Sequence, residues 1–337
     1  MNRTFLIIDT AHMLHRARHV TSGDIWTQTG LSLHVLLSSI KKCWKMFEAD
    51  HVVFALEGRS WRRELYTPYK RNRDADRSKK SPTEIESDAI FNEGVNAFIK
   101  FVQDHSNCTI LQNEICEADD CIARWIHNHP NDNHVIVSGD TDFIQLLKPN
   151  VQIYDGVKNI IIKPEGIFSE SGKPVHFQVQ SNTKLKVLKE AKKNETVDVP
   201  EDWIEWHLFL KCIRGDSSDN IFSAYPRANL NKIKNAFKDR HNKGYDWHNF
   251  MMTRWEDHND ESHRVKECYA LNQELIDLTK QPEEIKDLLD QTVTDAISEP
   301  KSNKQIGVYF LKFAGEYELN RIADHPKDFL DFLSAKY

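Results

Sequence analysis

Residues 134–142 read His134-Val135-Ile136-Val137-Ser138-Gly139-Asp140-Thr141-Asp142, an apolar β-branched run followed at once by two carboxylates on the turn that leaves it. Four further apolar runs are candidate strands, at residues 4–8, 51–56, 108–112 and 151–154. Helical patterns lie among them, at residues 31–47, 83–104, 118–127 and 142–147. This alternation predicts an α/β core over residues 1–163, with a largely parallel central sheet and helices on both faces.

The composition is that of a globular protein, since 28% of the 337 residues are charged and 39% are hydrophobic. A chain of this length favours two compact units, and the patterns predict a hairpin or linker at residues 164–200 and a mainly helical domain at 201–337. No apolar run approaches the roughly 18 to 20 residues that cross a bilayer. The six cysteines form no Cys-x-x-Cys pair, which argues against a disulfide framework or a structural zinc site. We therefore expect a cytoplasmic protein that does not enter a membrane.

Charge is distributed unevenly along the chain. The net charge is −6, but residues 62–80, 184–194 and 227–243 carry net charges of +5, +4 and +5, which leaves −20 for the rest. Such segregation favours basic surfaces for a polyanion and an acidic site elsewhere, although a single lysine-rich segment is as often a solvated face. The first basic segment lies in a long, proline-containing excursion at about residues 60–87, which interrupts the α/β alternation.

The clearest chemical signal is a set of carboxylates placed just after apolar runs or at helix starts. It comprises Asp9, Glu57, Glu117, Asp119, Asp120, Asp140, Asp142, Asp216 and Asp219. Taken singly, an aspartate at such a place is most often a helix cap. Parallel strands end at one edge of a sheet, however, so these separate acidic groups can meet there. Gathered carboxylates repel one another unless cations neutralise them, and hard oxygen ligands of this kind select Mg²⁺ or Mn²⁺.

Four segments carry a resemblance to a known family: Ile8-Asp9-Thr10-Ala11-His12-Met13-Leu14-His15-Arg16, Glu117-Ala118-Asp119-Asp120, Ser138-Gly139-Asp140-Thr141-Asp142 and Gly215-Asp216-Ser217-Ser218-Asp219-Asn220-Ile221. In this order they resemble the successive motifs of the structure-specific 5′-nuclease, or flap endonuclease, family. The bacteriophage 5′-3′ exonucleases with ribonuclease H activity look most similar. The resemblance spans residues 4–226 and implies a PIN-like nuclease core.

The resemblance also implies two bound Mg²⁺ ions, for which Mn²⁺ can substitute. It places Asp9, Glu57, Glu117, Asp119 and Asp120 around one ion, and Asp140, Asp142, Asp216 and Asp219 around the other. The segment Tyr69-Lys70-Arg71-Asn72-Arg73 matches the family's basic motif at the base of a helical arch over residues 71–87. In that motif Lys70 and Arg73 face the scissile phosphate, while Tyr69 and Arg71 are candidate nucleic-acid contacts. Arg16 matches a further phosphate contact. The ring of Tyr69 either stacks on an unpaired base or packs on the domain.

Two positions depart from the family pattern. Glu57 stands where most members have Asp, although its longer side chain can still bind a metal through water. The family's glycine hairpin, which holds the DNA backbone in a helix-hairpin-helix-like region, is replaced by Phe222-Ser223-Ala224-Tyr225-Pro226-Arg227-Ala228, without glycine. The charges of Lys232, Lys234 and Lys238 are the expected substitute for that contact.

These observations predict a divalent-metal-dependent hydrolase that cleaves phosphodiester bonds at 5′ ends, flaps, nicks or RNA primers in DNA replication or repair. It is expected to act on DNA as a monomer in a bacterial or phage-infected cell, with a single-strand-binding protein or a sliding clamp as candidate partners. One alternative is a catalytically weak protein that binds branched DNA or DNA ends. Another, an aspartyl phosphatase, needs a second carboxylate two residues beyond Asp9, where the chain has Ala11.

Overall fold

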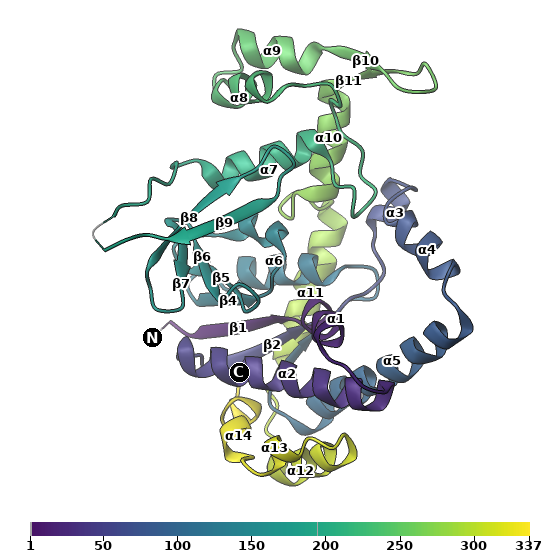
Figure 1. Cartoon of the computed structure of the whole chain (residues 1–337), viewed down its shortest axis with the longest axis vertical. Helices are drawn as coiled ribbons and strands as arrows, with labels where there is room; N and C mark the ends of the chain where they lie inside the picture. The colour runs from purple at the N-terminus through teal and green to yellow at the C-terminus, as the bar shows by residue number, and fades with distance from the viewer. Residues whose placement is uncertain (1, 194) are drawn as a thin grey trace.

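The computed structural model describes residues 2–193 and 195–337. Met1, the first residue of the predicted core, and Asn194, in the predicted linker and at the end of the second basic segment, lie outside the described residues. In the described part of the chain, nine strands form one sheet in the order β3-β2-β1-β4-β5-β6-β7-β8-β9. The sheet occupies the middle of the molecule, with helices above and below it (Figure 1).

The first five strands of this sheet are parallel. They are β1 (Thr4–Asp9), β2 (His51–Ala55), β3 (Thr109–Leu111), β4 (Asn133–Val137) and β5 (Val151–Asp155). Consecutive side chains on a strand point to opposite faces, so β1 contributes Phe5 and Ile7 to one core and Leu6 and Ile8 to the other. Burial on both faces explains the continuous apolar runs from which these strands were predicted. The predicted parallel sheet with helices on both faces is confirmed.

Each face of the sheet is covered by its own set of helices. Apolar side chains of one face pack against α6 (Ala118–Asn128), the 3₁₀ helix η1 (Thr141–Leu146) and α11 (Glu283–Ser298). Those of the other face pack against α1 (Thr10–Val20), α2 (Ile25–Met46), α5 (Pro82–His105), α12 (Ile306–Glu316) and α14 (Lys327–Ser334), with the short α13 (Asn320–Ala323) between the last two. Residues 283–337, which contain α11 to α14, therefore return to both faces of the sheet.

The residues expected as a hairpin or linker extend the sheet by antiparallel pairing. The added strands are β6 (Ile160–Lys163), β7 (Gly166–Ser169), β8 (Pro174–Val179) and β9 (Leu185–Glu190), and β9 forms the edge. Val175 and Leu185 are buried in the same core as the parallel strands. The division of the chain at residues 163 and 200 stays a prediction, whereas the packing makes these strands part of the sheet.

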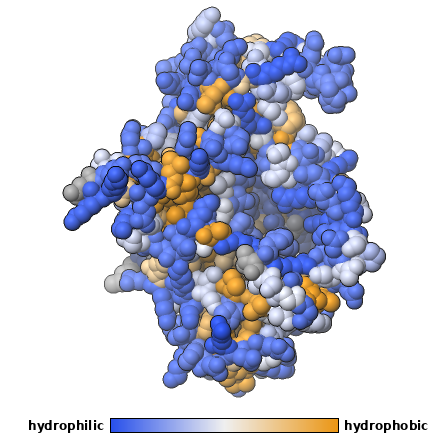
Figure 2. Space-filling model, viewed as in Figure 1, coloured by the Kyte–Doolittle hydropathy of each residue, from blue (hydrophilic) through white to orange (hydrophobic). Residues whose placement is uncertain are grey.

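A third apolar core lies beyond the sheet, among α7 (Trp203–Arg214), α8 (Leu230–Lys238), α9 (Tyr245–Met252) and α10 (Val265–Ile276). The small hairpin β10 (Arg254–Glu256) and β11 (Ser262–Arg264) adjoins it. On one side of the molecule, α3 (Arg62–Leu65), α4 (Arg71–Ser78) and the start of α5 form the arch, which curves outward (Figure 1). The surface is hollowed between the arch and the core, and hydrophilic residues surround the hollow (Figure 2).

Among the described residues, no helix combines the length and the apolar character needed to cross a membrane.

Candidate metal centre and nucleic-acid cleft

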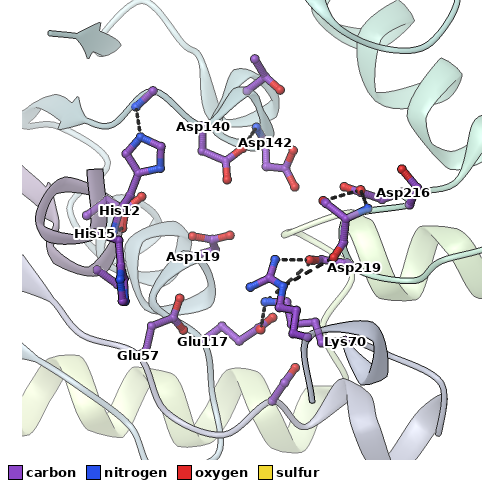
Figure 3. A pocket seen from close by; sticks show the side chains of 18 of the residues that line it. His12, His15, Glu57, Lys70, Glu117, Asp119, Asp140, Asp142, Asp216 and Asp219 are labelled. Atoms are coloured by element: carbon purple, nitrogen blue, oxygen red, sulfur yellow. Dashed lines mark hydrogen bonds and ion pairs between the residues drawn. The ribbon is translucent and has the colours of Figure 1, made fainter. Parts of the chain in front are cut away.

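The carboxyl ends of the parallel strands open onto a cleft of about 1620 Å³. Eight of the nine predicted carboxylates line it: Asp9, Glu57, Glu117, Asp119, Asp140, Asp142, Asp216 and Asp219. Figure 3 shows Asp140 and Asp142 on one side of the cleft, Glu57 and Glu117 on the opposite side, and Asp119 between them. Groups separated by up to about 200 residues in the sequence therefore meet at one edge of the sheet, as the strand pattern predicts.

The first two carboxylates lie at the carboxyl ends of strands, Asp9 as the last residue of β1 and Glu57 two residues beyond β2. Asp9 ends β1 and caps α1 by accepting a hydrogen bond from the backbone N–H of His12 at 3.2 Å, and Ser138 Oγ donates to Asp9 Oδ2 at 2.8 Å. Burial raises the pKa of Asp9, although His12 and Ser138 oppose the shift. Desolvation in the cleft and the charge of Glu117 raise the pKa of Glu57 to about 7.

Helix α6 presents two neighbouring aspartates in opposite directions. Asp119 lines the cleft, and burial together with the charges of Asp140 and Asp9 raises its pKa well above the ordinary value. Asp120 is 0% exposed and does not line the cleft. It accepts hydrogen bonds from Arg62 at 2.7 and 2.8 Å, and also from Trp61 Nε1 and Gln281 Nε2 at 3.1 and 3.0 Å.

The predicted metal role of Asp120 therefore needs correction, because both of its carboxylate oxygens are occupied by internal donors. Burial alone would raise the pKa of Asp120, but the charge and hydrogen bonds of Arg62 hold it below the ordinary value. Asp120 also accepts from the backbone N–H of Glu117, forming a reciprocal capping box at the start of α6. Its position at the helix start is explained by the capping role, which is also expected from the sequence, and not by direct metal binding.

The opposite wall of the cleft is organised by a buried lysine. Lys211, on α7, contacts Asp142 and lies 2.9 Å from Asp216 Oδ2. Although burial opposes ionisation of Asp216, Lys211 and hydrogen bonds from Ser218 lower its pKa to about 2. Burial raises the pKa of Asp142 despite the same lysine. Asp140 caps η1 by accepting from the backbone N–H of Asp142 at 2.9 Å, which fixes the turn between these two carboxylates.

The base of the arch is tied directly to the acidic groups. Lys70 contacts Glu117 and lies 3.8 Å from Asp219, while Arg73 Nη2 donates to Asp219 Oδ1 at 2.5 Å. Tyr69 is 2% exposed, and its hydroxyl lies 2.8 Å from Glu117 Oε2 and 3.0 Å from Asp219 Oδ2. Of the two roles open to Tyr69, stacking on a base is excluded by burial of its ring. Instead, its hydroxyl links two carboxylates of the cleft.

The other predicted nucleic-acid contacts differ in position. Arg16 lines the cleft from α1, whereas Arg71 is exposed on α4 outside the cleft lining. Lys232, Lys234 and Lys238 are exposed on α8 and do not line the cleft either. Their contact with a nucleic acid stays a prediction.

Two buried cations that contact the acidic residues of the site, Arg62 and Lys211, were not identified from the sequence. Arg62 is a fully buried arginine in a segment that reads as a solvated basic arm, so nothing local distinguishes it from Arg63. Lys211 interrupts the apolar run Leu210-Lys211-Cys212-Ile213. A charged residue inside such a run is almost never fully buried without a partner, and this was the available signal.

The cleft oxygens lie farther apart than those of a preformed chelating triad. Among the described residues, the group of three ligand atoms within 4.8 Å of one another is Asp257, Glu261 and His263, at the β10–β11 hairpin. The wider spacing in the cleft suits Mg²⁺, which keeps several of its waters and binds through one or two carboxylates. Burial is the largest cause of the raised pKa values of Asp9, Glu57, Asp119 and Asp142, and the charges of neighbouring carboxylates add to it at Glu57, Asp119 and Asp142. A bound cation would offset both effects.

A large mixed sheet covered by helices on both faces defines the class of fold, which is PIN-like and resolvase-like. Residues 4–172 match the family described as 5′-3′ exonuclease, N-terminal resolvase-like domain. The chain belongs to this family.

Curated relatives support the assignment over part of their length. DNA polymerase I of Rhizobium leguminosarum is 25% identical over 230 residues, which are 64% of this chain and 18% of that protein. Flap endonuclease Xni of Shewanella denitrificans is 30% identical over 165 residues, which are 47% of this chain and 59% of that protein. The chain therefore spans less than two thirds of each of these relatives.

Solved structures share the fold along most of the chain. A bacteriophage T5 protein co-crystallised with metal ions matches with a TM-score of 0.60 and 17% identity, over 88% of this chain and 99% of that one. A complex of the bacteriophage T5 flap endonuclease with DNA and metal ions matches with a TM-score of 0.59 and 16% identity, over 88% and 100% of the two chains. At these identities the likeness establishes the fold alone.

Proposed function

We propose that this protein is a divalent-metal-dependent 5′-nuclease, which hydrolyses phosphodiester bonds at the 5′ ends, flaps, nicks or RNA primers of DNA in replication or repair. The observation that carries this proposal is the meeting of eight carboxylates in one cleft with Lys70 and Arg73 at its rim. An acidic site binds metal ions, and the adjoining cations attract the phosphates that those ions must reach.

Two Mg²⁺ ions, or Mn²⁺ in their place, fit the donor set. Asp9, Glu57, Glu117 and Asp119 would hold one ion, and Asp140, Asp142, Asp216 and Asp219 the other, partly through water. When bound, such ions activate a water for attack and neutralise charge on the phosphate during in-line displacement. Hydrolysis would leave a 5′-phosphate and a 3′-hydroxyl.

The chain's own side chains supply the remaining functions. Lys70 and Arg73 can exchange their carboxylate partners for the scissile phosphate, whose developing charge they would stabilise. Tyr69 and Lys211 act as positioning residues, because each joins two carboxylates that come from distant parts of the chain or from different elements. Arg16, which lines the cleft from α1, would hold a further phosphate.

The names of two similar proteins support the substrate class. Flap endonuclease is the name of the Shewanella denitrificans relative, and the bacteriophage T5 flap endonuclease has been solved with DNA and metal ions. By analogy, we place this protein on branched or nicked DNA in the cytoplasm of a bacterial or phage-infected cell, as a monomer. A single-strand-binding protein or a sliding clamp is its proposed recruiting partner.

The proposal is tested by incubating the purified protein with end-labelled flap, nicked and RNA-primed duplexes, with Mg²⁺ or with EDTA. We expect products with 5′-phosphates in Mg²⁺ and none in EDTA. Tight binding to flap DNA without cleavage in Mg²⁺ or Mn²⁺ would instead establish a DNA-end binding protein.

A further inference from the structure

The β8–β9 hairpin reaches the cleft on the side away from the arch. Its turn, residues 181–184, lines the cleft together with the acidic groups. In Figure 1, β8 runs toward α7 and β9 runs back from it, so the turn lies beside that helix. The family match ends at residue 172, before β8 begins, so this hairpin is a feature of the chain that the matched domain does not include.

Helix α7 anchors the turn close to the acidic groups. His207 Nε2 lies 3.1 Å from the carbonyl oxygen of Thr183, and Arg214 Nε donates to the carbonyl oxygen of Ser181 at 3.2 Å. Arg214 is also the last residue of α7, immediately before Gly215 and Asp216. The turn is therefore held against the helix that supplies Lys211 and leads into the Asp216 loop.

The cations of this hairpin are free of internal carboxylate partners. Lys184, in the turn directly before β9, and Lys186, on β9, are both exposed, and Lys184 lines the cleft. Residues two apart along an extended segment point the same way. Within residues 2–193 and 195–337, neither lysine nor Arg214 forms an ion pair. The arch differs, since carboxylates pair with Arg63, Lys70, Arg73, Arg77, Lys79 and Lys80.

We propose that the β8–β9 hairpin is a second nucleic-acid-binding wall of the cleft, on which Lys184 and Lys186 bind backbone phosphates of the duplex opposite the arch. This inference rests on the proposed function and extends it to a surface outside the family match. Unpaired cations bind phosphate without first giving up an internal partner, so the hairpin contributes affinity, whereas Lys70 and Arg73 at the base of the arch act at the reacting phosphate.

Edge protection is the competing explanation for these lysines. Strand β9 is the edge of the sheet, and lysines on an edge strand discourage pairing with other chains. Edge protection requires charge along β9. It does not require a lysine that lines the cleft, or a turn that is anchored beside the cleft. Both features are present, since Lys184 lines the cleft and α7 anchors the turn that carries it through the carbonyl oxygens of Ser181 and Thr183.

The test compares two double variants that remove equal charge. Lys184→Gln with Lys186→Gln neutralises the hairpin, and Lys304→Gln with Lys312→Gln neutralises two exposed lysines near and on α12, outside the cleft lining. Binding of a fluorescein-labelled 5′-flap duplex is measured by anisotropy in EDTA at several salt concentrations. Cleavage of the same duplex in Mg²⁺ is measured separately on the parent protein.

Each phosphate contact contributes about 0.9 to the slope of log K against log salt concentration, so the hairpin variant should lose roughly 1.8 of that slope and bind about 10- to 60-fold more weakly at 0.1 M salt. The α12 variant should match the parent. A charge-preserving Lys184→Arg, Lys186→Arg variant should regain the parental slope.

An unchanged slope and affinity in the hairpin variant, or no duplex binding by the parent, would overturn the inference. Aggregation of the hairpin variant with parental binding would assign the lysines to edge protection instead. The parent could bind the duplex, and the hairpin variant show the predicted loss of slope, without any cleavage by the parent in Mg²⁺. That result would refute the proposed nuclease activity but would support the binding wall.

Discussion

Asp119 and Asp120 are neighbours in the sequence, and the structure predicts opposite consequences for changing them to asparagine. Asp119 is a crowded carboxylate in the cleft, whereas Asp120 is the buried counter-ion of Arg62. Asp119→Asn should weaken metal binding and stabilise the metal-free protein at pH 8. Asp120→Asn should destabilise the protein while leaving its metal affinity close to the parental value.

The magnitude for Asp120 follows from its burial. Arg62 and Asp120 have side chains that are 2% and 0% exposed and are joined by two hydrogen bonds of 2.7 and 2.8 Å. Removing one partner of a buried pair costs about 3–5 kcal/mol when the other charge is left uncompensated. Arg62 would keep Glu117, at 3.2 Å, as a second partner. We therefore expect Asp120→Asn to lower the free energy of unfolding by about 3 kcal/mol, at the lower end of that range, a fall in Tm on the order of 5 °C.

The sign for Asp119 follows from its raised pKa. A carboxyl group whose folded-state pKa lies above its unfolded value binds more protons in the folded protein, so stability falls as pH rises through that interval. Asp119→Asn removes the cost of ionising this carboxyl group in the folded protein. In EDTA the variant should therefore be more stable than the parent at pH 8, and equally stable at a pH well below the ordinary aspartate pKa.

Both effects are measured by urea unfolding in EDTA and by calorimetric titration with Mn²⁺. The Asp120→Asn titration is performed below the unfolding transition of that variant. Loss of Mn²⁺ binding in Asp120→Asn with unchanged stability would refute the assignment of Asp120 to a structural pair. Equal destabilisation by the two variants would refute the placement of Asp119 among crowded carboxylates.

Three further outcomes are expected. In EDTA, the parent should lose stability as pH rises from about 4.5 to about 7, because the pKa of Glu57 is raised to about 7. Glu57→Gln should flatten this pH dependence in urea unfolding. The same pH dependence in both proteins would show that Glu57 does not cause it. Lys70→Ala should lower the cleavage rate by roughly 10²- to 10³-fold while calorimetry shows that metal ions still bind, and a variant that loses the metal would show that Lys70 supports the carboxylates instead. Lys232→Glu with Lys234→Glu should weaken duplex binding and reduce its salt dependence, so an unchanged salt slope would mean that α8 does not contact DNA.

The sheet and most of its ligands could be predicted because the information is local. Apolar runs such as Phe5-Leu6-Ile7-Ile8 are buried on both faces, and a carboxylate directly after a run must lie at the carboxyl edge of a parallel sheet. Helix α1 was missed because Thr10–Val20 combines several histidines and arginines with few apolar residues. Its start is defined instead by the cap that Asp9 provides.

The remaining features depend on contacts between distant segments, which local patterns do not specify. Nothing near Leu185 indicates that β9 joins the sheet, since this follows from antiparallel pairing with β8 and from burial against the core. In the same way, Asp120 and Asp119 are both acidic residues at a helix start, and only the approach of Arg62 from the arch separates their roles. Sequence patterns therefore located the acidic site but could not tell a ligand from a counter-ion.

The most direct measurement uses Asp142→Ala and an end-labelled 5′-flap duplex in Mg²⁺, with binding followed by anisotropy in the same buffer. The variant should lose cleavage, because the carboxylate between Asp140 and Lys211 is gone, and should keep flap affinity within a few-fold of the parent. Cleavage at the parental rate by this variant would contradict the metal centre on which the whole account depends.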